Sequence, residues 1–126
     1  MKLSILLVDD SKFVRKGMVK ELPDILKGRE LVFSEAGNGN EALELLYANS
    51  YDIVFLDLTM PEKTGYEVLE SLKERGIKAN IIVLTADIQP ESERIVRSLG
   101  AAGYMEKQRP LNREALMKVL QEMNIL

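Results

Sequence analysis

Apolar residues along the chain fall into two alternating kinds of segment. Short runs rich in leucine, isoleucine and valine have the length and composition of strands that are buried on both faces. Between them, apolar residues recur at intervals of three and four, as in amphipathic helices. This repeated pattern predicts an α/β fold with a five-stranded parallel sheet and helices on both of its faces. The expected strands are Leu3–Val8, Leu31–Ser34, Ile53–Asp57, Ile81–Thr85 and Gly103–Glu106.

Capping and turn residues indicate where the helices begin and end. The first helix is expected over Ser11–Leu22, with Pro23 ending or kinking it. Asn38 with Glu41, and Thr64 with Glu67, are each expected to form a capping box at a helix start. The other expected boundaries are Gly76 after the third helix, Pro90 and Ser98 as the limits of the fourth, Gly100 beyond it, and Asn112 as the N-cap of the last.

The polarity of the strands predicts their order in the sheet. The first, third and fourth strands are apolar throughout, so they should be central. The second is short and bordered by polar residues, which favours an edge position. A chain of 126 residues accommodates one domain, and with no linker or repeat we expect a single domain over residues 1–126, without an output domain.

The composition excludes several classes of function. The chain has no cysteine and no histidine, so disulfides, thiolate nucleophiles, Ser-His-Asp catalysis and imidazole metal sites are ruled out. A net charge of −3 gives no reason to expect nucleic-acid binding by the chain itself. No signal-peptide pattern is present, and no apolar run approaches the roughly 20 residues that span a bilayer. We therefore expect a soluble, cytoplasmic protein without a membrane partner.

Polar residues follow four of the apolar runs at the point where each strand ends. They are Asp9-Asp10, Asp57, Thr85 and Lys107. The carboxyl ends of parallel strands meet at one edge of the sheet, which is where such folds bind ligands. A single acid at a strand end is ordinarily just solvated, but this combination on four strands predicts a functional crevice.

The charges in this crevice suggest its chemistry. Two carboxylates about 5 Å apart repel each other by roughly 3 kcal/mol at an effective dielectric constant near 20. Lys107 supplies only one positive charge, so a hard divalent cation such as Mg²⁺ is expected beside the three acids. Asp57 is the candidate nucleophile, because a carboxylate can accept a phosphoryl group as an acyl phosphate. Lys107 and Thr85 would then stabilise the phosphoryl oxygens.

These residues, together with Met60-Pro61 and Gly65 after the acceptor, resemble the receiver domain of two-component response regulators in its stand-alone, CheY-like form. The resemblance covers essentially the whole chain. It implies a flavodoxin-like sheet with the strand order 2-1-3-4-5, of which CheY is itself a standard example. It also implies a sensor histidine kinase or phosphotransfer protein as the phosphoryl donor, and a downstream protein effector.

The resemblance further implies roles for individual residues. Asp10, Asp57 and the backbone carbonyl of Thr59 would hold Mg²⁺, and Asp9 would act through water. Phosphorylation of Asp57 would draw Thr85 toward the phosphoryl group and turn Tyr104 inward. The output surface formed by the fourth helix, fifth strand and fifth helix would change as a result.

Several residues depart from the family pattern or have an ordinary interpretation. Proline usually follows the family's lysine, whereas Gln108 stands here and Pro110 comes two residues later, so we expect a trans Lys107–Gln108 bond. Thr64 replaces a common acid and still serves as a helix cap. Thr59 and Asp87, two residues after Asp57 and Thr85, should lie near the water that attacks during dephosphorylation. Three arginines are interpreted as solvated surface residues, two of them paired with nearby acids: Arg94, Arg97 and Arg109.

Other functions fit the sequence less well. A haloacid-dehalogenase-type phosphohydrolase needs a second acid two residues after its nucleophile, where this chain has Thr59. A nucleotide binder would carry a glycine-rich loop after the first strand, where Asp9-Asp10-Ser11 stands instead. We therefore expect a signalling switch and not an enzyme. A degenerate receiver that binds partners without phosphorylation, and a receiver from a longer regulator, remain the alternatives.

Overall fold

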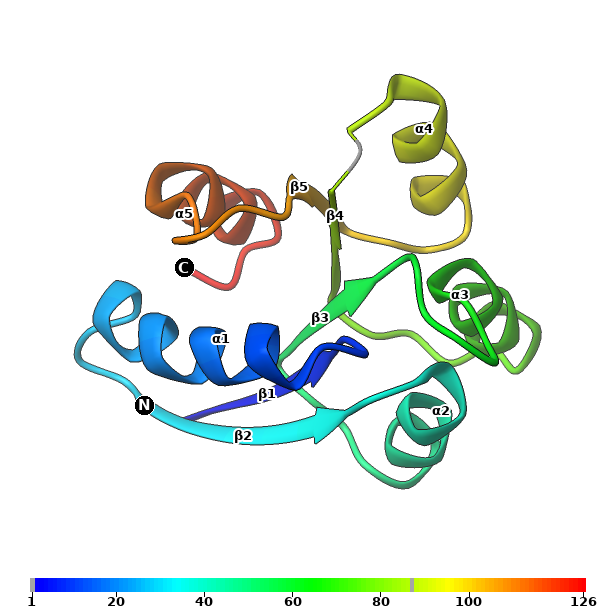
Figure 1. Ribbon diagram of the computed structural model, residues 1–126, viewed down its shortest axis with the longest axis horizontal. Helices are drawn as coiled ribbons and strands as arrows, with labels where there is room; N and C mark the ends of the chain where they lie inside the picture. The colour runs from blue at the N-terminus through cyan, green and yellow to red at the C-terminus, as the bar shows by residue number, and fades with distance from the viewer. Residues whose placement is uncertain (1, 87) are drawn as a thin grey trace.

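Strands and helices alternate strictly along the chain. The computed structural model describes residues 2–86 and 88–126. Figure 1 shows the strands in the middle of the molecule with helices around them, which confirms the predicted fold class. In chain order the elements are β1 (Lys2–Val8), α1 (Lys12–Ile25), β2 (Glu30–Ala36), α2 (Gly39–Ala48), β3 (Ile53–Asp57), α3 (Gly65–Glu74), β4 (Ile81–Thr85), α4 (Pro90–Ser98), β5 (Gly103–Glu106) and α5 (Arg113–Glu122).

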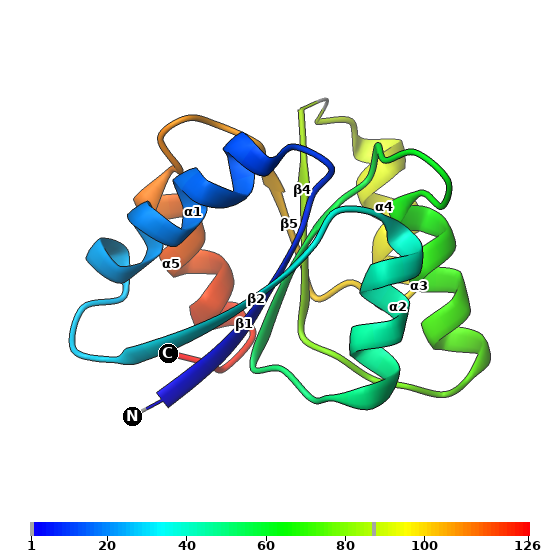
Figure 2. The same ribbon diagram turned by 60° about the horizontal axis from the view of Figure 1, so that its bottom comes forward.

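The five strands form one parallel sheet in the order β2-β1-β3-β4-β5. This is the order that the resemblance implied, with β1, β3 and β4 in the centre and β2 at an edge as predicted. Figure 2 shows α1 and α5 on one face of the sheet and α2, α3 and α4 on the other. Because every crossover connects parallel strands, all five strands end at the same edge of the sheet.

Alternate residues of each central strand enter two separate hydrophobic cores. On β1, Leu6 and Val8 pack under α2, α3 and α4, while Ile5 and Leu7 pack against α1 and α5. β3 follows the same period of two and is buried along its whole length. Burial on both faces fixes the register of these strands, and therefore the position of every residue at their carboxyl ends.

The first crossover differs from the sequence prediction. α1 begins after its N-cap Ser11, continues through Pro23 and ends at Ile25, three residues beyond the predicted Leu22. Pro23 lies in the last turn, where its missing N–H removes only one helical hydrogen bond. Leu22 and Leu26 are 0% and 1% exposed, and the Leu26 N–H donates to the Leu22 carbonyl at 2.8 Å. Burial of these leucines holds the turn that proline weakens.

β2 is also longer than predicted, because it pairs with all seven residues of β1, from Lys2↔Glu30 to Val8↔Ala36. The expected Leu31–Ser34 was too short, since an edge strand keeps polar residues that interrupt the apolar pattern. The capping box at α2 is incomplete as well. Asn38 Oδ1 accepts the Glu41 N–H at 2.9 Å, but the Glu41 carboxylate accepts the N–H of Gly37 instead of that of Asn38.

β1 begins at Lys2, one residue before the predicted Leu3, and the remaining helix boundaries agree with the predictions. Thr64 and Glu67 form a complete capping box, and Asn112 caps α5 through the Ala115 N–H. Gly76 and Gly100 follow α3 and α4 with φ of +68° and +109°, which glycine adopts readily. Within the described ranges the cis peptide bond is Arg109–Pro110, so Lys107–Gln108 is trans as expected. None of the helices in those ranges is both long and apolar enough to cross a membrane.

Candidate functional site

Three carboxylates meet at the carboxyl edge of the sheet. Asp9 and Asp10 follow β1, and Asp57 is the last residue of the neighbouring β3. One carboxylate oxygen from each lies within 4.8 Å of the others. Asp9 and Asp57 are only 4% and 6% exposed, whereas Asp10 is exposed to solvent. The sequence predicted this cluster, and its oxygen donors are those that a hard divalent cation prefers.

Lys107 crosses from β5 to the acids. Its Nζ lies 2.6 Å from Asp9 Oδ2 and 3.5 Å from Asp57 Oδ2. The Lys107 N–H donates to the Thr85 carbonyl at 2.7 Å, which extends the β4–β5 ladder by one step. The lysine is therefore held by its backbone while its side chain reaches the carboxylates. In this structure Asp9 contacts Lys107 directly, and its Oδ1 accepts the Ser11 N–H at 2.9 Å.

Burial dominates the electrostatics of Asp57. Removal from water raises the pKa of the Asp57 carboxyl, and the charge of Asp9 raises it further. Lys107 and the Thr59 N–H lower it, but they do not compensate fully, so the pKa stays above its usual value. Burial lowers the pKa of Lys107, yet its hydrogen bond to Asp9 and the charges of Asp57 and Asp9 outweigh this and raise it. The ammonium form of Lys107 is thus stabilised.

Thr85 and Thr59 border the acids from two sides. Thr85 ends β4, next to β3 in the sheet, and is 7% exposed. Thr59 is exposed in the loop after β3, and its N–H donates to Asp57 Oδ1 at 3.4 Å. Both therefore lie where the sequence placed them. Asp87, expected near the attacking water, lies outside the described residues.

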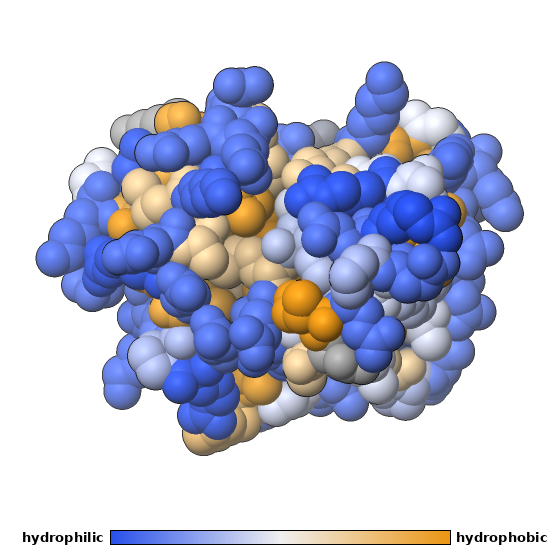
Figure 3. Space-filling model, turned by 90° about the horizontal axis from the view of Figure 1, so that it is seen from above, coloured by the Kyte–Doolittle hydropathy of each residue, from blue (hydrophilic) through white to orange (hydrophobic). Residues whose placement is uncertain are grey.

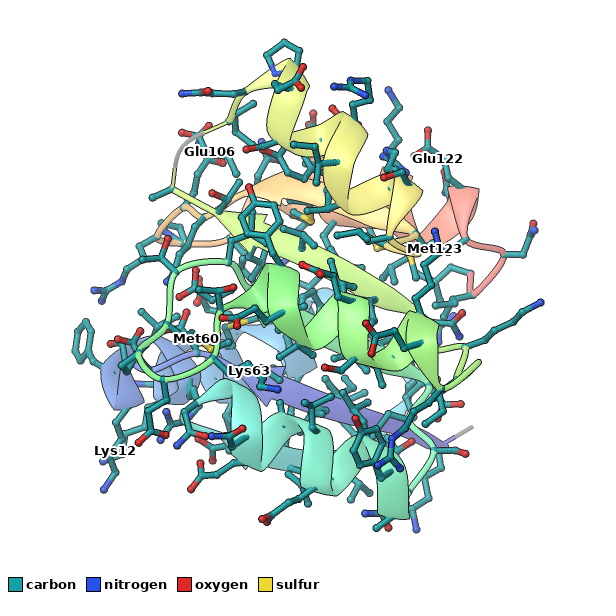
Figure 4. The ribbon with its side chains drawn as sticks, turned by 90° about the vertical axis from the view of Figure 1, so that its right-hand side faces the viewer. Lys12, Met60, Lys63, Glu106, Glu122 and Met123 are labelled. Atoms are coloured by element: carbon teal, nitrogen blue, oxygen red, sulfur yellow. The ribbon has the colours of Figure 1, made fainter. Side chains whose placement is uncertain are left out.

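Two glycines allow the β3–α3 loop to pack closely around Asp57. A Cβ on Gly65 would lie 2.4 Å from the Asp57 carbonyl oxygen, so only glycine lets α3 begin against this strand end. A Cβ on Gly39 would lie 2.4 Å from the Lys63 carbonyl oxygen. Figure 4 shows Met60 and Lys63 on this loop, with Lys63 where the loop passes the start of α2. Close packing on both sides fixes the loop that carries Thr59.

Tyr104 lies on the α4 side of β5, away from the carboxylates. It is 9% exposed, and its hydroxyl lies 3.4 Å from the backbone N and 3.5 Å from the carbonyl oxygen of Gln89. The ring is therefore inward in this structure, against the loop that precedes α4. Because β4 carries Thr85 and continues into that loop, Tyr104 contacts the segment that a movement of Thr85 would affect.

A groove of about 490 Å³ lies between α4, β5 and α5. Figure 3 looks onto this side of the molecule and shows pale and orange atoms in a band bordered by blue, hydrophilic residues. Ile88 and Ile95 are 47% and 37% exposed at the α4 side. On α4 itself, Arg94 pairs with Glu91, and Arg97 Nε lies 2.9 Å from Glu93 Oε2, as the helical spacing predicted.

Arg15 was not found from the sequence, although it supports the site. Its Nη1 donates to the Asp9 carbonyl at 2.5 Å, and its Nε donates to Glu35 Oε1 at 2.9 Å. It thereby ties the loop after β1 to the edge strand β2. A lone arginine on an amphipathic helix is ordinarily solvated, and the contact depends on the length of β2, which was underestimated.

Arg109 was expected on the surface, and its guanidinium stacks over the ring of Phe13 at 4.0 Å.

The family follows from this fold and site together with sequence comparison. The model of the response regulator receiver domain matches residues 5–121. The chain therefore belongs to the response regulator receiver domain family, the receiver module of two-component systems. This confirms the resemblance inferred from the site residues.

Individual relatives resemble the chain over most of its length. Chemotaxis protein CheY of Halobacterium salinarum is 36% identical over 122 residues, which are 95% of this chain and 98% of that protein. The nitrate/nitrite response regulator NarL of Escherichia coli K12 is 35% identical over 123 residues, but the match covers only 53% of NarL. The chain thus spans about half the length of NarL and nearly all of the archaeal CheY.

Solved receiver structures share the fold. Chemotaxis response regulator CheY4 of Vibrio cholerae is 31% identical with a TM-score of 0.77, and the match covers 96% of this chain and 98% of CheY4. The receiver domain of the putative response regulator NarL from Mycobacterium tuberculosis is 28% identical with a TM-score of 0.79, covering 97% and 95% of the two chains.

Proposed function

We propose that the chain is a phosphoacceptor switch that takes a phosphoryl group onto Asp57 from a phosphohistidine of a sensor histidine kinase or phosphotransfer protein. The observation that carries this proposal is the position of Asp57, which is buried, next to two further carboxylates and 3.5 Å from the ammonium of Lys107. On this proposal all of residues 1–126 form one receiver domain, and the chain is a switch and not an enzyme acting on a metabolite.

The transfer is a substitution at phosphorus. A carboxylate oxygen of Asp57 forms the new P–O bond while the P–N bond to the donor imidazole breaks. The imidazole nitrogen keeps the bonding electron pair and takes a proton from solvent, and Asp57 becomes an acyl phosphate. Lys107 neutralises oxygens of the phosphoryl group, and the Thr85 hydroxyl donates to one of them.

Mg²⁺ is the cofactor proposed for this site. Asp10, Asp57 and the Thr59 carbonyl would hold it, with Asp9 acting through a bound water, and when bound it would neutralise charge on the phosphoryl oxygens. The carboxylate cluster supports this assignment, since within residues 2–86 and 88–126 its three acids face a single ammonium, that of Lys107. Mg²⁺ accepts such mixed sets of carboxylate, carbonyl and water oxygens.

The output is proposed to be a change of the surface formed by α4, β5 and α5. A phosphoryl group brings close to two negative charges, and Thr85 is the uncharged donor that can move toward it. The Tyr104 ring is already inward and contacts the loop between Thr85 and α4, so a movement of Thr85 would reach α4 through this contact. A downstream protein effector would read the groove between α4 and α5.

We propose a cytoplasmic location and no nucleic-acid or membrane partner for the chain itself.

Labelling with a small phosphodonor tests the proposal. Incubation with phosphoramidate and Mg²⁺ should add one phosphoryl group to the intact mass of the protein, and Asp57→Asn should remain unlabelled. Asp52→Asn is the matched control, because Asp52 is an exposed aspartate that contacts Ser4 near the start of β1. Labelling that persists in Asp57→Asn would assign the wrong acceptor. An unlabelled wild-type protein would favour the alternative of a receiver that binds partners without phosphorylation.

A receiver that is part of a longer regulator is the second alternative. The half-length match to NarL favours it, whereas the nearly full-length match to the archaeal CheY favours a free-standing protein. The length of the complete reading frame distinguishes the two.

A further inference from the structure

The loop that follows Lys107 lacks the proline that would stiffen its first step. Gln108 stands directly after the lysine, and Leu111 is the next residue whose backbone N–H is tied to another element. Lys107 must nevertheless hold its ammonium against Asp9 and Asp57. On its N-terminal side Lys107 is held by the bond from its N–H to the Thr85 carbonyl, and on its C-terminal side its position depends on what holds the loop over residues 108–112.

One stripe of α1 contacts this loop. Figure 2 shows the loop from β5 to α5 passing over α1. Phe13, Glu21 and Asp24 lie on one face of the helix, at spacings of eight and three residues. Their partners lie two residues apart along the loop and the start of α5: the Arg109 guanidinium, the Leu111 N–H and the Arg113 guanidinium.

The Glu21 contact is the least exposed of the three. Arg113 and Asp24 are exposed by 53% and 63%, so solvent screens their ion pair, and Phe13 is 63% exposed. Glu21 is partly buried, and its Oε1 accepts the Leu111 N–H at 2.9 Å. A hydrogen bond to a charged acceptor is stronger than a neutral one. Leu111 is 8% exposed, so without Glu21 its N–H would be left without a partner in a buried position.

Packing alone does not hold the loop down. A cavity of about 330 Å³ lies between α1 and the loop, and Glu21, Lys107 and Leu111 all line it. Side chains on the two sides of this open pocket do not pack against each other across it. The hydrogen bond across this gap therefore carries more of the restraint than it would in a filled core.

We propose that Glu21 is a positioning residue for Lys107: by fixing the Leu111 N–H to α1, it holds the loop so that the Lys107 ammonium stays against Asp9 and Asp57. The proposal rests on the proposed phosphoacceptor function, because the positioned lysine serves phosphoryl transfer there. The Glu21 hydrogen bond restrains the loop after Lys107, as a proline directly after the lysine would.

Two substitutions at Glu21 separate positioning from general stability. Glu21→Ala removes the acceptor, and Glu21→Gln keeps an oxygen at the same place. Amide hydrogen exchange should become at least tenfold faster at both Leu111 and Lys107 in Glu21→Ala, and return close to wild-type rates in Glu21→Gln. Exchange at Val83, in the centre of the sheet, should not change. Faster exchange at Leu111 with an unchanged rate at Lys107 would overturn the proposal.

Phosphorylation supplies the second readout. In saturating Mg²⁺, phosphoramidate should label Glu21→Ala about tenfold more slowly than wild type, and the Mg²⁺ affinity should not fall, since the Lys107 ammonium competes with the cation for Asp9 and Asp57. Glu21→Gln should restore the rate. Equal labelling rates for wild type and Glu21→Ala would contradict the positioning role. If the wild type takes no label, the proposed function fails, while the exchange rates still decide whether Glu21 positions Lys107.

Discussion

At the scale of single residues, burial dominates the electrostatics of Asp57. Burial and the neighbouring Asp9 raise its pKa in the folded protein, whereas the unfolded chain leaves it near the usual value of about 3.9. The folded state thus binds the proton more tightly. Stability contributed by this group is present at low pH and is lost as pH rises from the unfolded pKa through the folded one.

Asp57→Asn should therefore stabilise the protein at neutral pH in the absence of divalent cations. Asparagine keeps the shape of the side chain without its charge, and we expect a gain on the order of 1 kcal/mol, or about 4 °C in melting temperature for a domain of this size. The gain should vanish near pH 3, where the carboxyl of the wild type is protonated. Thermal melts of both proteins in chelator at several pH values measure this. A gain that does not depend on pH would contradict the electrostatic explanation.

Asp10 is the residue that tests the proposed metal site. It is exposed and its carboxylate lies within 4.8 Å of those of Asp9 and Asp57, so Asp10→Asn removes a ligand without opening the core. We expect Mg²⁺ affinity to fall at least tenfold, measured by chemical-shift titration. Asp24→Asn removes the same charge from the surface of α1 and should leave the affinity within twofold. Equal affinities for wild type and Asp10→Asn would exclude Asp10 as a ligand.

At the scale of elements, the sequence predicted best what burial determines. Strands such as Ile53–Asp57 are buried on both faces, so the first and last residues of the apolar run are also those of the strand. β2 was predicted too short because an edge strand carries polar residues such as Glu35, and its extent is set by pairing with β1. α1 continues beyond Pro23 because of a tertiary contact as well: the burial of Leu26 stabilises the last turn of the helix.

The residues of the candidate site also fall into two groups, those that the sequence predicted and those that it did not. Asp57 and Thr85 end strands and Lys107 directly follows one, so the topology alone brought them to one edge. Arg15 and Glu21 bind backbone groups of other elements through their side chains, and such contacts leave no periodic signal in the sequence. These two contacts could be identified only once the structure gave the path of the loops.

The junction between β3 and α3 gives a prediction at this scale. Gly65→Ala would place a Cβ 2.4 Å from the Asp57 carbonyl oxygen and 2.8 Å from Leu58 Cα, so strand or helix must shift. We expect a loss of about 1–3 kcal/mol, as for overpacking elsewhere, together with slower labelling of Asp57. Urea unfolding measures the first effect.

Gly17→Ala is the matched control for this substitution. Gly17 lies inside α1, and a Cβ there would meet its nearest neighbour, Glu21 Oε2, at an ordinary 3.6 Å. Alanine favours a helix interior over glycine by about 0.5–1 kcal/mol, so this variant should be more stable than wild type. If Gly65→Ala is as stable as Gly17→Ala, the junction can accept a Cβ at residue 65, and the expected steric clash is wrong.

At the scale of the whole molecule, β4 and β5 link the carboxylate site to the groove between α4, β5 and α5. β4 ends at Thr85 in the crevice and continues into the loop before α4, while β5 carries Tyr104 toward that loop and Lys107 toward the acids. A change at Asp57 can therefore reach α4 through Thr85 and the contact between Tyr104 and Gln89. In the part of the chain that the structure describes, no comparable contact connects Asp57 to the far end of β2, which lies at the edge of the sheet opposite β5.

Addition of a phosphoryl mimic such as beryllium fluoride with Mg²⁺ should therefore change NMR shifts in two places: around Asp57, and along α4, β5 and α5. Shifts near Leu31 on β2 should not change. Tyr104→Ala removes the ring that contacts Gln89, so the crevice should still respond while the changes in α4 fall by at least half. Thr85→Ala should have the same effect, because no hydroxyl remains to follow the phosphoryl group. If the mimic perturbs only the crevice in the wild type, phosphorylation does not switch this surface, and a partner must read the phosphoryl group directly.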